Sequence, residues 1–353
     1  FRMPFPSGWD ESFYMSQLSS AAQDGDLMLQ NDLLIFNNPL DEKFRSVELL
    51  NDKGYHLNAF SVGPAVFYSI PVSVVYAFGG ARFDENFQRA IAIWAAIFWF
   101  LGLAAVWDIL KLAETDKATR YLTLFISVFS TPLILYGTRF YLTAHFLSTI
   151  LIAFSVYLWI QWFRTAGYLT AWFMGLTAGL LVVTRWESGL FFISVLYPLV
   201  HSFLDPETRK KRLGGFVIAV ASSLLVVFVQ MTAWKIQYGT WICMPQGGDF
   251  MKWTSPALIQ LLISGFHGLL PWAPGLLFGF AGLLLFGFKI ENPVLRRLVP
   301  GLLIYCLVQY YISAAAWDWW AGAAYGPRRL TLLWAPAALG WGLVLSRCRP
   351  WAR

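Results

Sequence analysis

Long apolar segments recur from residue 90 almost to the end of the chain, and they predict a membrane environment. A helix needs about 20 apolar residues to cross the hydrocarbon core of a bilayer. The candidate segments, several of them short, lie near residues 90–110, 121–137, 145–163, 169–186, 190–204, 214–234, 270–288, 298–316 and 330–346. Only 13% of the residues are charged, against about 25% in soluble domains. We predict an all-α polytopic membrane protein, with residues 90–353 forming a transmembrane domain of about nine spans.

The basic residues predict how these spans are oriented, because short loops rich in Lys and Arg stay on the cytoplasmic side. With nine spans, the loops of one side contain Lys111, Lys117, Arg120, Arg164, Arg209, Lys210, Lys211, Arg212, Lys289, Arg296, Arg297, Arg347, Arg349 and Arg353. The opposite loops contain Arg139, Arg185, Lys235, Lys252, Arg328 and Arg329. We assign the larger set to the cytoplasm. The net charge of +6 forms no broad basic surface, so no nucleic-acid partner is expected.

Residues 1–89 are then predicted to form one external loop with short helices beside the membrane. Asp10 can cap an amphipathic helix that ends near residues 24–26, and the polar remainder is expected to form turns. The apolar segment 60–78 contains a glycine and two prolines. This favours a re-entrant or interfacial helix over a plain span, although a spanning or soluble-core helix is the alternative. Because the chain opens at Phe1 on polar sequence, we expect a further helix upstream.

Ionisable residues cluster at the external ends of the apolar segments. Such groups near hydrocarbon cost several kcal/mol unless they are paired or wetted, which makes them candidate functional sites. The clusters are Asp10 with Glu11, Arg139 with His145, Arg185 with Glu187, and Asp318 with Arg328 and Arg329. The alternative is that they lie in headgroup water.

Asp10 is the candidate base. A carboxylate at this place can take the proton of an attacking hydroxyl while a phosphate leaves from the other face, or it can simply cap a helix. A divalent cation, Mg²⁺ or Mn²⁺, held by Asp10 and its neighbours is a further hypothesis. No metal-ligand spacing appears at His56 or the other external histidine, and the HExxH, Walker and dinucleotide motifs are absent from the sequence.

The segment from Trp317 to Arg329 is the most unusual part of the chain. Its adjacent Arg328 and Arg329 can bind phosphate oxygens in bidentate geometry and neutralise a leaving phosphate. The alternative is anchoring at the membrane interface by aromatic rings and long basic side chains. Arg185 and Glu187 are two residues apart, so on a helix they would not face each other, and we expect each to have another partner. Both either enter an active cavity or pair between helices.

Several of these motifs together resemble the GT-C superfamily of polyprenyl-phosphate-sugar-dependent glycosyltransferases. The likeness is to bacterial relatives of the protein O-mannosyltransferases and of the aminoarabinose transferase that modifies lipid A. The motifs are Trp9-Asp10-Glu11, Gly25-Asp26-Leu27, the segments 60–65 and 185–189, and the segment 322–330 with its Gly-Pro-Arg-Arg sequence. Two departures from that family are expected from the sequence: the helix that normally precedes the acidic loop, and a soluble domain after residue 346, do not appear in it.

The resemblance implies a GT-C-like helical bundle with a cavity that opens outward beneath the first loop. Asp10 and Glu11 would be catalytic, and Arg328 and Arg329 would meet the donor phosphate. We assign the rest of the substrate cavity to His56, Arg139, His145, Arg185, Glu187, Asp318 and Tyr325.

The implied reaction is the inverting transfer of a monosaccharide from a polyprenyl-phosphate donor to a hydroxyl of a glycan, lipid or protein. Its implied place is a bacterial inner or plasma membrane, with the active site on the extracytoplasmic side. A transporter or lipid flippase is one alternative, for which the two halves should share interrupted helices. A non-catalytic membrane subunit is another.

Overall fold

The structure is a computed structural model that describes residues 9–36, 51–55, 57–81, 83–322 and 324–348 of the chain. It is 76% helical, and the described part contains one isolated β-bridge, Met251 with Ala316, but no strand. The N-terminal half has α1 (Trp9–Ser19), η1 (Ser20–Asp24), α2 (Gln30–Phe36), α4 (Gly63–Ala77), α5 (Glu85–Leu112), α6 (Lys117–Phe129), α7 (Leu133–Thr138), α8 (Ala144–Thr165) and α9 (Tyr168–Thr184). The remainder has η2 (Trp186–Phe192), α10 (Ile193–Phe203), α11 (Arg209–Tyr238), η3 (Gly248–Phe250), α12 (Leu258–Ile263), α13 (Leu269–Trp272), α14 (Pro274–Phe286), η4 (Gly287–Lys289), α15 (Pro293–Ala315), η5 (Arg328–Leu333) and α16 (Trp334–Cys348).

All nine apolar segments of the sequence are largely helical, which confirms the all-α membrane fold class. Among the described residues, α5, α8, α11, α15 and the continuous η5–α16 are long and apolar enough to cross a membrane. The apolar α4, α9 and α14 with η4 are shorter. The segment 121–137 is broken into α6 and α7 around Pro132, because proline lacks the backbone N–H that a continuous helix needs. The nine-span topology stays a prediction.

The N-terminal region contains the amphipathic helix that the sequence predicts, as α1. Its π-helical continuation η1 ends at Gly25, whose φ of 72° is in the left-handed region that glycine adopts readily. The expectation of turns alone after this point is wrong for α2. Leu29 and Leu33 are four residues apart, and both pack with Phe13 and Phe60 in a small apolar cluster that stabilises this helix.

Helix α4 occupies the ambiguous apolar segment. Its 15 residues, at about 1.5 Å each, cover roughly 22 Å, less than the hydrocarbon core of about 30 Å. A Cβ at Gly63 would lie only 2.4 Å from the Cα of Thr184. Glycine therefore lets the start of α4 lie directly against the end of α9, at the edge of the candidate site.

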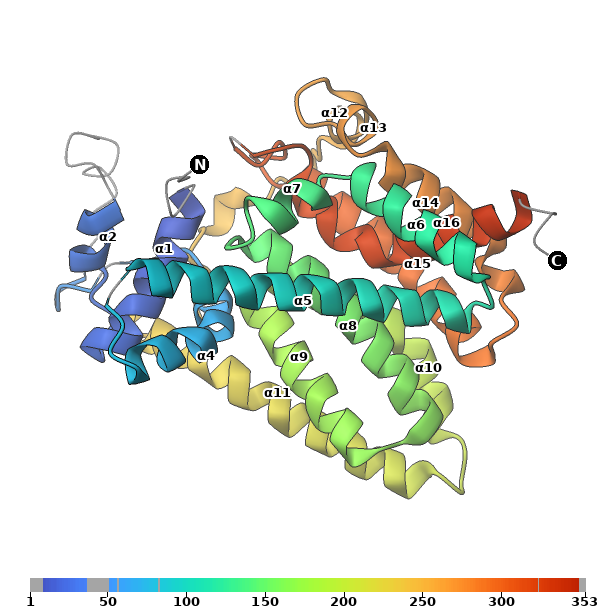
Figure 1. Cartoon of the computed structure of the whole chain (residues 1–353), viewed down its shortest axis with the longest axis horizontal. Coiled ribbons are helices and arrows are strands. Elements are labelled where there is room, and N and C mark those ends of the chain that lie inside the picture. The colour runs from blue at the N-terminus through green and yellow to red at the C-terminus, as the bar shows by residue number, and fades with distance from the viewer. Residues whose placement is uncertain (1–8, 37–50, 56, 82, 323, 349–353) are drawn as a thin grey trace.

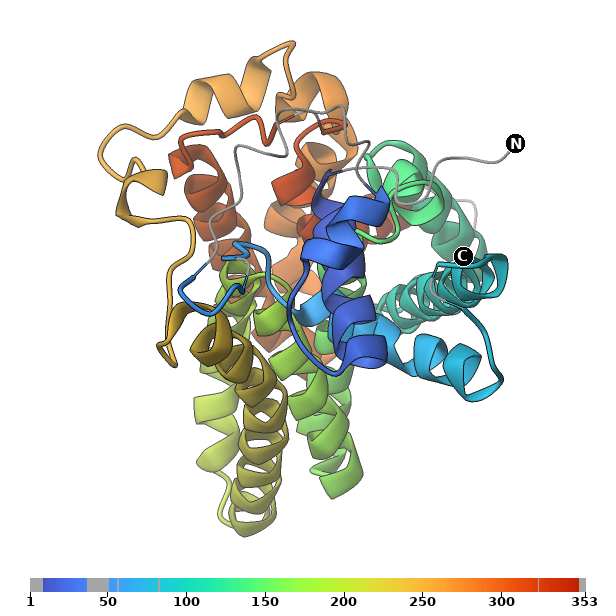
Figure 2. The ribbon, with the colours of Figure 1, turned by 90° about the vertical axis from the view of Figure 1, so that its left-hand side faces the viewer.

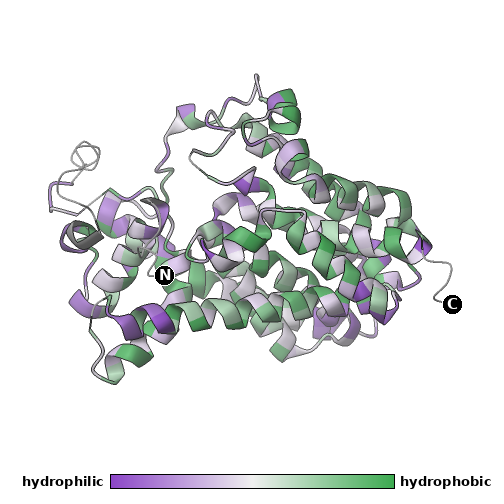
Figure 3. Cartoon of the chain, turned by 45° about the horizontal axis from the view of Figure 1, so that its top comes forward, coloured by the Kyte–Doolittle hydropathy of each residue, from purple (hydrophilic) through white to green (hydrophobic). Residues whose placement is uncertain are grey.

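Helices α1, α2 and α4 gather around the start of α5 at one end of the molecule, and α16 ends at the other end (Figure 1). Viewed from the N-terminal end, α1 stands in front of the long helices, with α4 and the end of α11 below it (Figure 2). Apolar residues dominate the long helices, and polar residues are frequent around the N-terminal elements and at helix ends (Figure 3). This distribution is the one expected of helices in a bilayer with functional groups at one end.

Helices α14 and α16 approach each other through small residues. A Cβ at Gly340 would lie 1.7 Å from the carbonyl oxygen of Gly279, and a Cβ at Gly279 would lie 2.3 Å from that of Ala337. Small residues permit such backbone contact between membrane helices. The contact fixes α16, and with it the preceding η5 that carries Arg328 and Arg329.

We expect Gly340→Ala to destabilise the protein by about 1–3 kcal/mol, since overpacking a close contact costs that much. The measurement is thermal unfolding of the detergent-solubilised protein. Gly265→Ala is the matched control, because a Cβ there has no neighbour within 4 Å. Equal melting temperatures for the two variants would contradict the inferred contact.

Candidate active site

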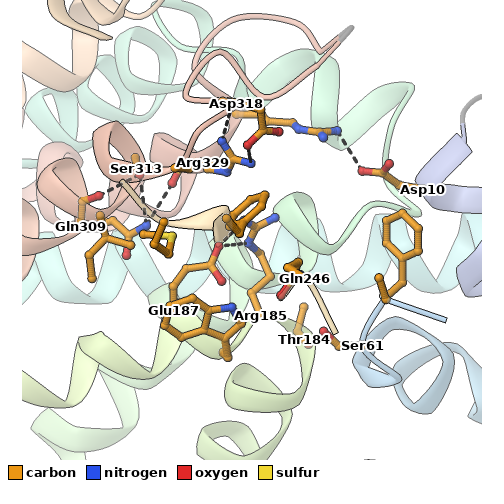
Figure 4. Close-up of a pocket in the computed structure, with 18 of the residues that line it drawn as sticks. Asp10, Ser61, Thr184, Arg185, Glu187, Gln246, Gln309, Ser313, Asp318 and Arg329 are labelled. Carbon is orange, nitrogen blue, oxygen red and sulfur yellow. Dashed lines mark hydrogen bonds and ion pairs between the residues drawn. The ribbon is translucent and has the colours of Figure 1, made fainter. Parts of the chain in front are cut away.

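A pocket of about 350 Å³ lies where the start of α1, the end of α9 and the start of η5 meet. The loop before Met251, the last turns of α15 and the segment before α4 complete it. Its lining includes most of the ionisable residues that the sequence predicts, and Figure 4 shows ten of the lining residues labelled. Segments more than 300 residues apart in sequence therefore share one site.

Asp10 and Arg328 form an ion pair across this pocket. Arg328 Nη1 donates to Asp10 Oδ2 at 2.9 Å, and each side chain keeps about a fifth of its surface exposed. Arg328 Nε is buried without a hydrogen-bond partner. Since a guanidinium can donate five hydrogen bonds in a planar fork, Arg328 retains donor capacity for an anionic ligand.

Arg329 is held in place by Asp318. Its Nη2 donates to Asp318 Oδ1 and its Nη1 to the Asp318 carbonyl oxygen, both at 2.7 Å (Figure 4). The guanidinium carbon also lies 5.7 Å from the centre of the Phe250 ring, within cation–π range. A side chain fixed on three sides loses little further freedom when it binds a ligand.

Arg185 and Glu187 pair with each other, which was not expected of residues two apart, and Arg185 has in addition the further partner that was expected of it. Helix α9 ends at Thr184, and Arg185 has an extended backbone with φ of −154° and ψ of 117°. This break brings together two side chains that a helix would keep apart, and Arg185 Nε donates to Glu187 Oε1 at 2.8 Å (Figure 4). Arg185 Nη1 also lies 2.7 Å from Nε2 of His145.

His145 is buried in the first turn of α8 and lies behind the pocket wall. Its side-chain contact is with Arg185, which lines the pocket. His145 therefore holds one pocket arginine in position and does not itself line the pocket.

Several uncharged polar residues of the pocket, Gln309, Ser313 and Gln246 among them, were not predicted as site residues. Gln309 and Ser313 lie one turn apart on α15, fully buried, and Gln309 Nε2 donates to the Arg329 carbonyl oxygen at 3.4 Å. Two polar residues in an otherwise apolar helix could have indicated a functional site from the sequence. Gln246 comes from the loop after α11 and had no such signal.

Tyr14 lies one turn after Asp10 on α1 and also lines the pocket. Burial raises the pKa of its hydroxyl, and the Asp10 carboxylate adds to the effect. Tyr14 therefore stays protonated at neutral pH and can donate a hydrogen bond into the site.

The other assigned residues lie outside the described pocket lining. Arg139 is exposed, with its guanidinium 5.5 Å from the ring centre of Phe140. Tyr325 packs edge-on against Trp272. Glu11, in the first turn of α1, is buried. His56 falls outside the described residues. The assignment of Glu11 to catalysis, and of the other three residues to the substrate cavity, stays a prediction.

The carboxylates Asp10, Glu187 and Asp318 are each paired with an arginine through one oxygen. A divalent cation at this place would have to compete with these guanidinium groups for the carboxylates. Within the described part of the chain, no three His, Cys, Asp or Glu residues are grouped so that they could hold a metal ion.

Comparison with solved structures identifies the fold. The oligosaccharyltransferase of Archaeoglobus fulgidus, solved with zinc and sulfate, matches with a TM-score of 0.52 and 16% identity over 83% of this chain and 41% of that one. The same enzyme, tethered to an acceptor peptide with an NVT sequon, matches with a TM-score of 0.51 and 14% identity over 83% and 42%. The chain thus spans about two fifths of those proteins. No family model and no curated protein matches the sequence.

The oligosaccharyltransferase is a GT-C superfamily enzyme, and this chain shares its fold over the matched region. The fold part of the resemblance read from the motifs is thereby confirmed.

Proposed function

We propose that this protein is a GT-C glycosyltransferase that moves one sugar from a polyprenyl-phosphate donor to an acceptor hydroxyl on the extracytoplasmic side of the membrane. The observation that carries the proposal is the Asp10–Arg328 pair, with Arg329 and Arg185, in one pocket at the ends of apolar helices. A base and phosphate-binding cations within one site are the groups that this transfer requires.

In the proposed reaction, the phosphate of the sugar donor accepts hydrogen bonds from the N–H groups of Arg328 that are not already paired. The Asp10 carboxylate then rotates toward the acceptor. Asp10 accepts the proton of the acceptor hydroxyl while that oxygen bonds to the anomeric carbon. The bond from this carbon to the phosphate oxygen breaks, and its electron pair leaves with the polyprenyl phosphate. Attack opposite the leaving group inverts the anomeric centre. Arg328 and Arg329 stabilise the charge that develops on the leaving phosphate.

The size of the pocket favours a single sugar as the transferred group. Its volume of about 350 Å³ is at the lower end of the roughly 300–1,000 Å³ typical of small-molecule sites. A monosaccharide with its phosphate suits that space better than a long oligosaccharide. Hexoses and pentoses both remain within the proposed donor class.

The test is transfer by the purified chain in liposomes, with radiolabelled polyprenyl-phosphate hexoses and pentoses as donors and membrane lipids, glycans and peptides as acceptors. Polyprenyl-diphosphate oligosaccharide serves as the comparison donor. We expect transfer from a monophosphate donor and none from the diphosphate. Movement of the intact donor between leaflets without transfer would instead identify a flippase, and no activity of either kind would favour a non-catalytic subunit.

We expect this transfer to be insensitive to EDTA. The pocket carboxylates are already neutralised by Arg185, Arg328 and Arg329, so the leaving phosphate is stabilised by guanidinium groups. The measurement is the initial rate with EDTA, with and without added Mg²⁺ or Mn²⁺. A loss of rate that either metal restores would contradict the proposed arginine-based site.

A further inference from the structure

A second, larger cavity of about 760 Å³ lies between α1 with its continuation η1, the helix α4 and the end of α11. It is separate from the candidate active site, and no assigned catalytic or phosphate-binding residue lines it. In Figure 2 these three elements stand together on the N-terminal side of the molecule.

The two cavities follow one face of α1. Asp10 and Tyr14 line the active-site pocket, and Gln17 and Ala21 line the second cavity. Spacings of three or four residues place side chains on the same helix face. Gln17 lies seven positions after Asp10, about 10 Å along a helix. This is the distance that the head group of a lipid bound in the second cavity would have to cover to reach Asp10.

Gln17 marks the boundary between the two cavities. Its Nε2 donates to the carbonyl oxygen of Phe60 at 3.1 Å, and Phe60 lines the active-site pocket. The side chain is only 1% exposed, and its Oε1 is buried without a hydrogen-bond partner. An unpaired buried amide oxygen is costly, and a ligand hydroxyl or amide N–H would satisfy it.

The remaining lining selects for an uncharged, partly apolar ligand. Asp26 is the only charged residue among the described residues that line the cavity, and it accepts hydrogen bonds from Ser20 and from the backbone of Met28. The described lining residues include no lysine or arginine that could bind a phosphate. Phe228 and Val229, which also line it, are about half exposed on α11, so the cavity opens toward the lipid-facing surface.

We propose that this cavity holds the acceptor, a membrane lipid whose hydrocarbon anchor lies against α11 and whose uncharged polar group bonds to Gln17. This inference rests on the proposed function, because it places the attacking hydroxyl of that lipid at Asp10. The donor phosphate and the acceptor anchor then occupy different cavities, and the acceptor is lipid-linked, not a soluble peptide.

The binding test uses the whole chain in nanodiscs and a hexadecyl glucoside with a diazirine in its chain. Labelled peptides are located by mass spectrometry after irradiation, without any donor. We expect labelling of α1, α4 and α11 at the cavity, competed by unmodified hexadecyl glucoside and not by hexadecanoate, which is charged. Labelling spread over all lipid-facing helices, α5 included, would overturn the proposal.

Two substitutions close the cavity in different ways. Ala233→Trp fills its interior, where Ala233 is 4% exposed, and Ser73→Trp adds an indole at an exposed lining position. Leu225→Trp on the lipid-facing side of α11 is the matched control. We expect cavity labelling to fall about tenfold, the effect of 1.4 kcal/mol in binding, in both cavity variants and not in the control. Unchanged labelling in properly folded Ser73→Trp protein would contradict the proposal.

Product analysis separates this inference from the proposed function. We expect transferred sugar in the organic-solvent-extractable lipid fraction, with Ser73→Trp lowering that transfer while donor binding is unchanged. Transfer only to soluble or protein acceptors would overturn the acceptor assignment and leave the glycosyltransferase proposal standing. Absence of any transfer counts against the proposed function, and the donor-free labelling still decides whether the cavity binds the lipid.

Discussion

Asp10→Asn is expected to lower the rate of sugar transfer about 10²- to 10⁴-fold, the usual contribution of a positioned general base. The amide keeps the size of the side chain and can no longer accept the hydroxyl proton. Donor affinity should change little, because the arginines that bind the phosphate remain. Single-turnover rates with saturating donor, alongside equilibrium donor binding, measure the two effects separately.

Asp52→Asn is the matched control, since Asp52 is exposed in the same N-terminal region and is not among the described residues that line the pocket. Asp10→Asn protein with the rate of the control would remove Asp10 as the base. A parallel loss of donor binding would instead show that the Asp10–Arg328 pair mainly shapes the phosphate site.

Arg328→Ala is expected to cost about 10²- to 10³-fold in transfer, as is typical when one preorganised donor to a developing negative charge is removed. The loss should exceed that of a simple charge effect because the substitution also leaves Asp10 without its partner. Arg328→Lys should recover part of the rate, since an ammonium keeps the charge but lacks the planar fork. The measurement is kcat/KM for the donor.

Lys53→Ala removes one positive charge at a solvent-exposed position outside the pocket and is the control for that series. If Arg328→Ala and Lys53→Ala have the same kcat/KM, the donor phosphate does not bind at Arg328. Combining Arg328→Ala with Asp10→Asn should cost less than the two separate losses added together, because paired residues are coupled.

The sequence predicts the helical membrane fold well because long apolar segments have few other stable arrangements. It also places Asp10 and Arg328 on the same side, through the distribution of Lys and Arg between loops. The sequence places the end of a span near residue 186, but it gives no sign that Arg185 itself takes an extended backbone. The pairing of Arg185 with Glu187 depends on that break.

Tertiary contacts account for the other differences. Helix α2 is stabilised by the packing of Leu29 and Leu33 against Phe13 and Phe60. The sequence does not indicate this contact, because polar residues surround the two leucines. Gln309 belongs to the site because the last turns of α15 lie against η5, where its side chain donates to the Arg329 carbonyl oxygen. This placement depends on packing between helices that are distant in sequence.

Three arginines and three carboxylates among the described lining residues leave the empty pocket electrically balanced. A phosphate that enters therefore makes the site negative, and each carboxylate competes with it for the same guanidinium groups. The site should consequently hold the spent carrier loosely after the sugar has gone. This charge arrangement favours rapid release of the polyprenyl phosphate product in repeated catalytic cycles, more than tight binding of the donor.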